Sequence, residues 1–130
     1  MPYVDLVAIL AVLQFFFFAL MTGRARMVTG VKAPATSGHE DFDRMYRVQM
    51  NTLELLVMFL PALLLAGKYF SGLTWLVAAL GSMYIIGRFV YWRAYVGDPA
   101  KRGLGFGLSM LPILVLILMA LVGIILSLLS

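Results

Sequence analysis

Four polar residues at the start of a long apolar segment have the types and the spacing to bind a charged ligand. Arg44, Arg47, Asn51 and Glu54 fall within about 80° of one another on one face of a helix that turns about 100° per residue. After them the segment becomes almost wholly apolar, as a membrane-spanning helix is. Guanidinium, amide and carboxylate groups are costly beside lipid, so they are expected to face protein or water and to form a functional site.

A second polar stripe lies in the third apolar segment, where Tyr84, Arg88, Tyr91 and Tyr95 share one helix face. If the two segments pack side by side, the stripes enclose a cationic pocket with tyrosine hydroxyls and one buried carboxylate, that of Glu54. Arginine pairs with carboxylates, glutamate accepts from an ammonium group, and asparagine both donates and accepts. This chemistry fits a small zwitterion with more than one carboxylate, and glutathione is such a molecule.

Each of these residues, taken alone, also has a simpler interpretation than ligand binding. Arg93, Lys101 and Tyr84 are typical membrane-interface anchors, and Arg102 alone could be a solvated loop residue. Asn51 and Glu54 could instead hold helices together in an oligomer through hydrogen bonds. The joint arrangement favours a binding site over these separate roles.

The composition is that of an integral membrane protein. Of the 130 residues, 63% are hydrophobic and 12% are charged, and the mean hydropathy is +1.00, whereas soluble domains are about 45–50% apolar and about 25% charged. The absence of cysteine excludes a disulfide or a cysteine nucleophile within the chain, and a single histidine excludes a multi-histidine metal cluster, so no metal site is expected. The net charge of +4 is attributed to membrane orientation and not to nucleic-acid binding.

The sequence predicts an all-α membrane protein, a single four-helix transmembrane domain over residues 1–130. The spans cover about 4–21, 42–67, 73–95 and 104–129, with the first loop expected from Thr22 to Asp41. Every lysine and arginine except Lys68 then falls on the side of the first and third loops. By the positive-inside rule these two loops are cytoplasmic and both termini lie outside.

The segment G-H-E-D-F-D-R-M-Y-R-V-Q-M-N-T, which runs from Gly38 to Thr52, resembles the signature of the MAPEG family. These are membrane-associated proteins in eicosanoid and glutathione metabolism. The departures from the signature are Asp43 for Glu, Met45 for Val, Val48 for Ala and Thr52 for Cys. The resemblance covers the whole chain, since the length, the four spans, the long first loop and the tyrosines and arginine that end the third span are also similar.

The resemblance implies a homotrimer with active sites between subunits and with glutathione as co-substrate. The positions that match the glutathione-binding residues of the family are Arg26, Arg47, Gln49, Asn51, Glu54, Tyr91 and Tyr95. For the first of these, Arg24 is an alternative match. Arg102 matches the residue that stabilises the thiolate, and it is the predicted catalytic residue.

The expected activity is that of a microsomal-type glutathione transferase, in which the thiolate attacks an apolar electrophile or reduces a lipid hydroperoxide that arrives from the bilayer. Leu55 stands where the leukotriene-forming branch has tyrosine, which puts the substrate of that branch in doubt. The alternative is a lipid-binding scaffold of the same fold without catalysis. A small multidrug/proton antiporter ranks last, because the first span carries only Asp5, at its outer end. The electrophile, and the use of another low-molecular-weight thiol, stay open.

Overall fold

The computed structural model describes residues 2–130, which form four long helices: α1 (Pro2–Thr29), α2 (Glu40–Tyr69), α3 (Thr74–Gly97) and α4 (Gly103–Leu129). Short 3-10 turns at Ser71–Leu73 and Pro99–Lys101 precede α3 and α4. All four helices are long and apolar enough to cross a membrane, and residues 2–130 contain no strand. The predicted all-α, four-helix membrane bundle is therefore confirmed.

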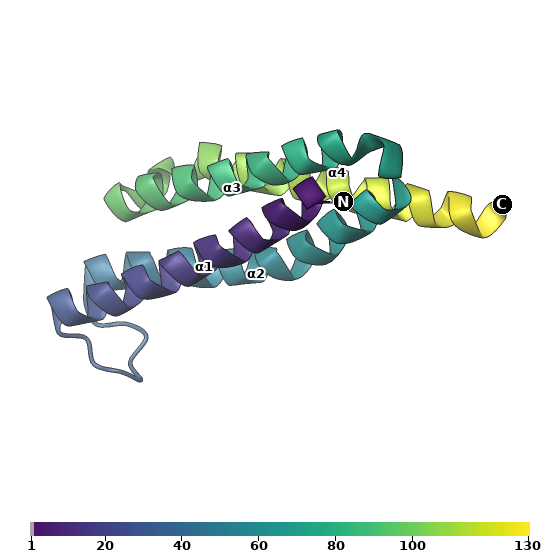
Figure 1. Cartoon of the computed structure of the whole chain (residues 1–130). Helices are drawn as coiled ribbons and strands as arrows, with labels where there is room; N and C mark the ends of the chain where they lie inside the picture. The colour runs from purple at the N-terminus through teal and green to yellow at the C-terminus, as the bar shows by residue number, and fades with distance from the viewer. Residues whose placement is uncertain (1) are drawn as a thin grey trace.

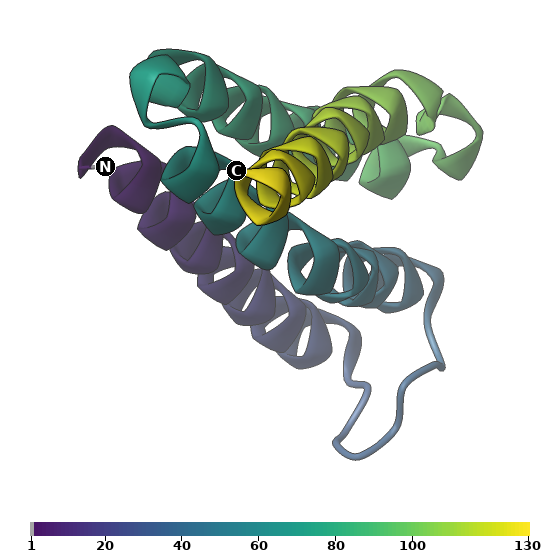
Figure 2. The same ribbon diagram turned by 90° about the vertical axis from the view of Figure 1, so that its right-hand side faces the viewer.

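The helices run up and down in two hairpins, α1 with α2 and α3 with α4 (Figure 1). The hairpins pack together mainly through α2 against α4, with further contacts of α3 on α1 and α2. The long α1–α2 loop and the α3–α4 turn lie at the same end of the bundle, and the α2–α3 turn lies at the other, as the turned view in Figure 2 also shows. The two polar stripes of α2 and α3 therefore lie at the same end.

Helix α1 is longer than the sequence predicted. The first loop was expected to begin at Thr22, but α1 continues to Thr29 and carries Arg24 and Arg26 on its last turns. Met21 and Ala25 pack against the buried cluster around Phe18, which favours continued helix. The helix ends at Thr29. Gly30 follows it with a φ of 78°, which suits a glycine after a helix C-terminus, and its N–H donates to the carbonyl of Arg26 at 2.9 Å.

Two glycines bring α4 into backbone contact with α3. A Cβ added at Gly105 would lie 2.3 Å from the backbone nitrogen of Tyr91, and one added at Gly87 would lie 2.7 Å from the carbonyl carbon of Leu108. Neither position has room for a larger side chain, so the two helices approach closely there. This contact places α4 directly beside Arg88 and the tyrosines of α3.

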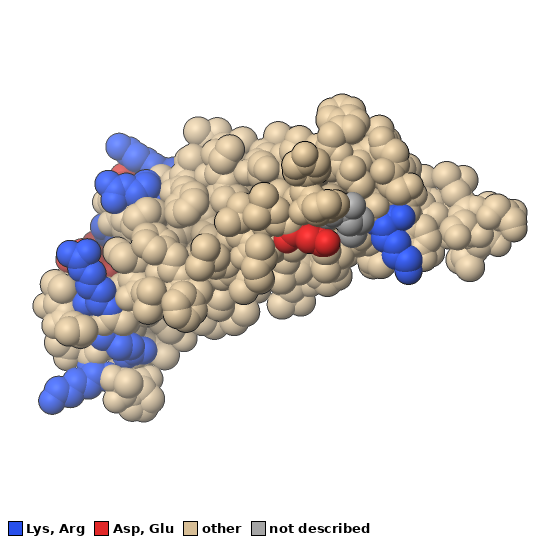
Figure 3. Space-filling view, in the orientation of Figure 1, with Lys and Arg blue, Asp and Glu red and all other residues tan. Residues whose placement is uncertain are grey.

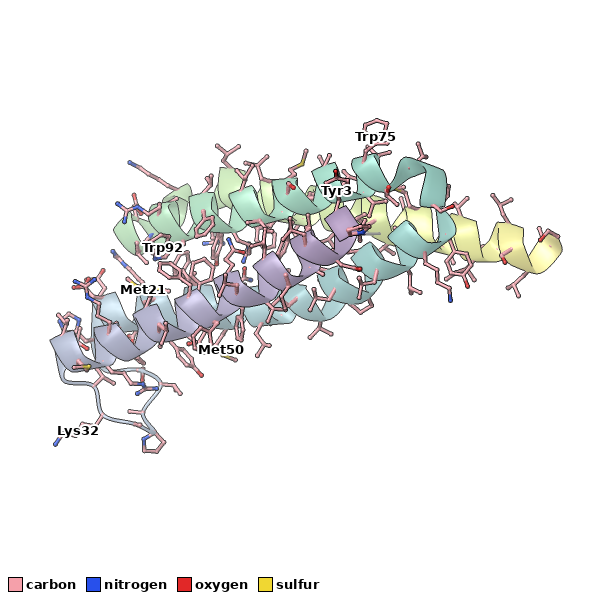
Figure 4. All side chains as sticks on the ribbon, in the orientation of Figure 1. Tyr3, Met21, Lys32, Met50, Trp75 and Trp92 are labelled. Atoms are coloured by element: carbon pink, nitrogen blue, oxygen red, sulfur yellow. The ribbon has the colours of Figure 1, made fainter. Side chains whose placement is uncertain are left out.

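Charge and aromatic side chains mark the two ends of the bundle. Lysine and arginine gather at the end with the α1–α2 loop, and much of the face between the ends is uncharged (Figure 3). Trp75 projects from the opposite end to Trp92 and Lys32 (Figure 4), and its side chain is well exposed. Tryptophans near both ends and an apolar surface between them are typical of a membrane-embedded bundle.

Candidate functional site

A pocket of about 410 Å³ lies where α2, α3 and α4 meet at the charged end of the bundle. Its lining residues are Arg47, Asn51, Tyr91, Tyr95, Arg102 and Phe106. Pockets for small ligands commonly measure about 300–1,000 Å³, so its size suits a small molecule. The structure thus brings together five of the residues predicted from the sequence.

Tyr91 and Tyr95 form one wall of the pocket. They are one turn apart on α3, and their rings stack with centroids 5.4 Å apart and planes at 17°. Tyr91 is almost fully buried, and Phe106 of α4 lies 6.3 Å from its ring. The wall therefore combines flat aromatic surface with phenol hydroxyl groups, which suits a ligand that has both apolar and polar parts.

Arg47 and Glu54 are paired with each other on the exposed face of α2. Their closest atoms, Nη2 and Oε1, are 2.9 Å apart, and their side chains are 50% and 56% exposed. Glu54 does not line the pocket, so the expectation of a buried carboxylate inside it is wrong for the single chain. Seven residues span about two turns, which lets these opposite charges meet along the outer face of the helix.

Arg44 departs from the stripe that the sequence predicted. Its Nη1 donates to the carbonyl oxygens of Val96 and Gly97 at 3.3 and 3.1 Å, and its Nη2 pairs with Glu40. The carbonyls in the last turn of a helix have no partner within that helix, so this arginine caps the C-terminus of α3. It fixes α2 to α3 and does not line the pocket.

Arg26 and Gln49 also lie outside the pocket of the single chain. Arg26 donates to the carbonyl of Ala35 at 2.7 Å and lies 4.6 Å above the ring of Phe42, so it holds the α1–α2 loop. Gln49 is partly buried on α2. The alternative residue Arg24 lines a separate groove beside Trp92. The roles of these residues in binding stay predictions.

Arg88 is a buried part of the site. The sequence placed it in the polar stripe of the third span but did not count it among the binding residues. It is completely buried, its Nη1 donates to Oδ1 of Asn51 at 2.7 Å, and its guanidinium lies 4.3 Å from the ring centroid of Tyr91. Asn51 and Tyr91 both line the pocket, so Arg88 lies directly behind its wall. The signal in the sequence was an arginine deep in an apolar span, three residues before Tyr91.

Arg102 lies at the rim, just before α4. Asp98 precedes the Pro99–Lys101 turn, and its Oδ1 accepts from the N–H of Ala100 at 3.1 Å. Arg102 follows this turn directly and lines the pocket. The residue is exposed, and among residues 2–130 its guanidinium makes a single long hydrogen bond of 3.5 Å, to the carbonyl of Pro99. It is thus held loosely and is available to a ligand.

The fold and the site define a four-helix membrane protein with a cationic, tyrosine-lined pocket at one end. The sequence model of the MAPEG family matches residues 4–122, and the chain belongs to this family.

Several proteins of known sequence are similar to the chain. A Synechocystis protein described as uncharacterized is 40% identical over 92% of this chain and 85% of its own length. Human microsomal glutathione S-transferase 2 is 37% identical over 91% of this chain and 79% of its own. Leukotriene C4 synthase of Cavia porcellus is 35% identical over 74% of this chain and 63% of its own.

Proposed function

We propose that the protein is a membrane-bound glutathione transferase that binds glutathione in the pocket between α2, α3 and α4. One observation carries the proposal: two guanidinium groups, an amide and two tyrosines converge on a cavity of about 410 Å³ at the charged end of a membrane bundle. The similarity to human microsomal glutathione S-transferase 2 supports the same function.

The Arg47–Glu54 pair suits the amino-acid end of glutathione. Its α-carboxylate would bind the guanidinium of Arg47 and its ammonium would bind the carboxylate of Glu54, so one exposed ion pair is replaced by two. The pair is half exposed in the free chain and therefore contributes little to stability, about 0–1 kcal/mol. Opening it to admit a zwitterion then costs little.

Arg102 is proposed to stabilise the thiolate of bound glutathione. A free thiol of this type has a pKa of about 8.5, so only a few per cent is ionised at neutral pH. A guanidinium near the sulfur lowers that pKa, and the proton leaves to solvent. The sulfur electron pair then forms a bond to an electrophilic carbon, and the leaving group departs with its electrons or, in an addition, water protonates the adjacent carbanion.

The second substrate is proposed to be apolar and to arrive from the bilayer. Phe106 gives the pocket an apolar edge next to Arg102, and its side chain is 38% exposed. A lipid hydroperoxide would use the same thiolate: the sulfur attacks the terminal oxygen, an alcohol leaves, and a second glutathione converts the sulfenic acid into glutathione disulfide and water.

The positions of Glu54, Arg26 and Gln49 are consistent with the proposed homotrimer. All three lie outside the pocket of one chain. Glu54 is more than half exposed beside Arg47, so a ligand that reaches both residues extends beyond the single-chain pocket. A site between subunits would complete the pocket with such residues. Native mass spectrometry from detergent checks this, since a monomeric active protein would rule out a shared site.

The test of function is conjugation by purified protein in detergent, with glutathione and a reactive aryl halide. We expect turnover that depends on protein and saturates with glutathione, and that is much weaker with cysteine, which lacks the other two residues of the tripeptide. A protein that binds lipid but gives no conjugate with any thiol would be a non-enzymatic lipid-binding scaffold.

A further inference from the structure

Arg88 has an unusual environment for a charged residue in a membrane protein. It lies nine residues before the end of α3, about 13 Å into the helix, and it is fully buried. No carboxylate of residues 2–130 lies within ion-pairing distance of it. A buried cation without a counter-ion is costly, so a role beyond packing is expected for it.

Neutral oxygen atoms accept hydrogen bonds from Nε and Nη1 of this guanidinium, whereas its buried Nη2 has no hydrogen-bond partner among residues 2–130. The direction of each of these hydrogen bonds is determined. The hydroxyl of Ser109 donates to the carbonyl of Gly105 at 2.7 Å, and that of Thr52 donates to the carbonyl of Val48 at 2.8 Å. Because each hydroxyl proton is already donated to a carbonyl, each hydroxyl oxygen can only accept from Arg88. The oxygen of Ser109 accepts from Nε at 2.8 Å, and that of Thr52 accepts from Nη1 at 3.3 Å.

The same reasoning fixes the side-chain amide of Asn51. A guanidinium has only donors, so the group that faces Nη1 of Arg88 at 2.7 Å must be the carbonyl oxygen Oδ1 and not the amide nitrogen. The NH2 group of Asn51 is then left to face the pocket that this residue lines. The sequence alone left Asn51 as both donor and acceptor, whereas in the fold its oxygen already accepts from Arg88 and its two N–H groups are the donors left for a ligand.

We infer that Arg88 is a positioning residue, which holds Asn51 with its NH2 group toward the pocket so that Asn51 recognises a carbonyl or carboxylate oxygen of the ligand. The inference rests on the proposed binding of glutathione in this pocket. Arg88 also supports the wall beside Asn51, because its guanidinium lies 4.3 Å from the ring centroid of Tyr91. It acts through these neighbours and does not itself line the pocket.

The substitution Asn51→Asp tests the direction of the amide without changing Arg88. A carboxylate has nearly the same shape and accepts from Arg88 at least as well, but it has no N–H to donate. We expect N51D to melt at or above the temperature of the wild type and to bind glutathione at least about tenfold more weakly in calorimetric titration. Wild-type affinity in N51D would overturn the inference.

A double-mutant cycle tests whether Arg88 acts through Asn51. Arg88→Lys keeps the positive charge but cannot hold the three acceptors in the same geometry. We expect R88K to weaken glutathione binding about tenfold in the wild-type background and less than about twofold in the Asn51→Ala background. Equal losses in both backgrounds would reject the positioning role, and if R88K does not fold, the result for N51D decides.

Ser109→Ala is the matched control, because it removes another hydrogen bond of Arg88 without touching Asn51. We expect S109A to lower the melting temperature while glutathione affinity stays within about twofold. An affinity loss as large as that of R88K would mean that binding follows general stability, and the inference would fail. A wild type that binds no glutathione would reject the proposed function itself, whereas a binding wild type with an additive cycle rejects only the role of Arg88.

Discussion

At the scale of single residues, the surroundings of each arginine decide what it can do. Arg44 donates to the C-terminal carbonyls of α3, and Arg88 donates from Nε and Nη1 to neutral oxygens. Arg47 is paired on an exposed surface, and Arg102 is held only by a long contact. Of these four arginines, only Arg47 and Arg102 both line the pocket and are exposed enough to bind an anionic group.

The exposed pair on α2 gives the first prediction. Arg47→Ala removes a carboxylate partner and Glu54→Gln removes an ammonium partner, so each should weaken glutathione binding by about tenfold or more. The unfolding free energy should change by less than about 1 kcal/mol, since the pair is half exposed. Isothermal titration and thermal unfolding measure the two quantities.

Arg93→Ala is the control for lost positive charge. Arg93 is on α3 at the same charged end of the bundle as Arg47, but it lines a different groove. It should bind glutathione as the wild type does. Wild-type affinity in both α2 variants would instead give Arg47 and Glu54 a purely structural role.

Helical periodicity could predict which polar residues share a face, and it correctly grouped Arg47 with Asn51 and Tyr91 with Tyr95. It could not predict how neighbours compete for the same groups. Arg44 donates to a carbonyl of α3, and Arg88 donates to the oxygen of Asn51. Both hydrogen bonds join residues that are 37 to 53 positions apart in the sequence. Periodicity within one helix cannot predict such contacts, because they depend on how the helices pack against one another.

At the scale of elements, the close contact of α3 and α4 shapes the pocket. Gly87 and Gly105 remove the side chains that would separate the two backbones. This contact lets Ser109 of α4 reach Arg88 and sets Phe106 beside Tyr91. Hydropathy could predict the helices but not these two close contacts, because a glycine that allows close packing looks the same in an apolar sequence as any other glycine.

A second prediction follows from this contact. Gly105→Ala would place a Cβ 2.3 Å from the Tyr91 nitrogen, so α4 must move away from α3. We expect a loss of about 1–3 kcal/mol in unfolding free energy, as for overpacked cores, together with weaker glutathione binding. Thermal unfolding and titration of the variant check both.

Gly107→Ala, two residues away, is the matched control. A Cβ at Gly107 meets nothing within 4 Å, and alanine favours a helix over glycine by about 1 kcal/mol. This variant should be as stable as the wild type or more so. Equal stability of the two alanine variants would show that the α3–α4 contact is not tight.

At the scale of the whole molecule, positive charge is concentrated at one end of the bundle (Figure 3). The α1–α2 loop and the α3–α4 turn lie at one end, where lysine and arginine gather, and Lys68 lies near the α2–α3 turn (Figures 1 and 3). We therefore expect the pocket to face the cytoplasm, where glutathione is available. Hydropathy alone could predict the four spans, but the pairing of the helices into two hairpins required the packed structure.

Cysteine labelling tests this orientation, and the lack of native cysteine makes the background clean. A membrane-impermeant thiol reagent applied outside intact cells should not modify cysteine at Thr36 or Gly103. It should modify cysteine at Gly72, in the turn between α2 and α3. The reverse pattern would place the pocket on the outer side.

The proposed chemistry requires that the pocket binds glutathione as a thiolate and that Arg102 stabilises this thiolate. The most direct test is a pH titration of the thiolate absorbance of glutathione bound to the wild type, to Arg102→Ala and to Lys101→Ala. Lys101 is an adjacent exposed cation that does not line the pocket, so its variant controls for lost charge. We predict a bound-thiol pKa below the free value of about 8.5 in the wild type and in K101A, and a pKa raised toward the free value in R102A. Two results would contradict this account: a bound-thiol pKa in the wild type that is not below the free value, or a bound-thiol pKa in R102A equal to that of the wild type.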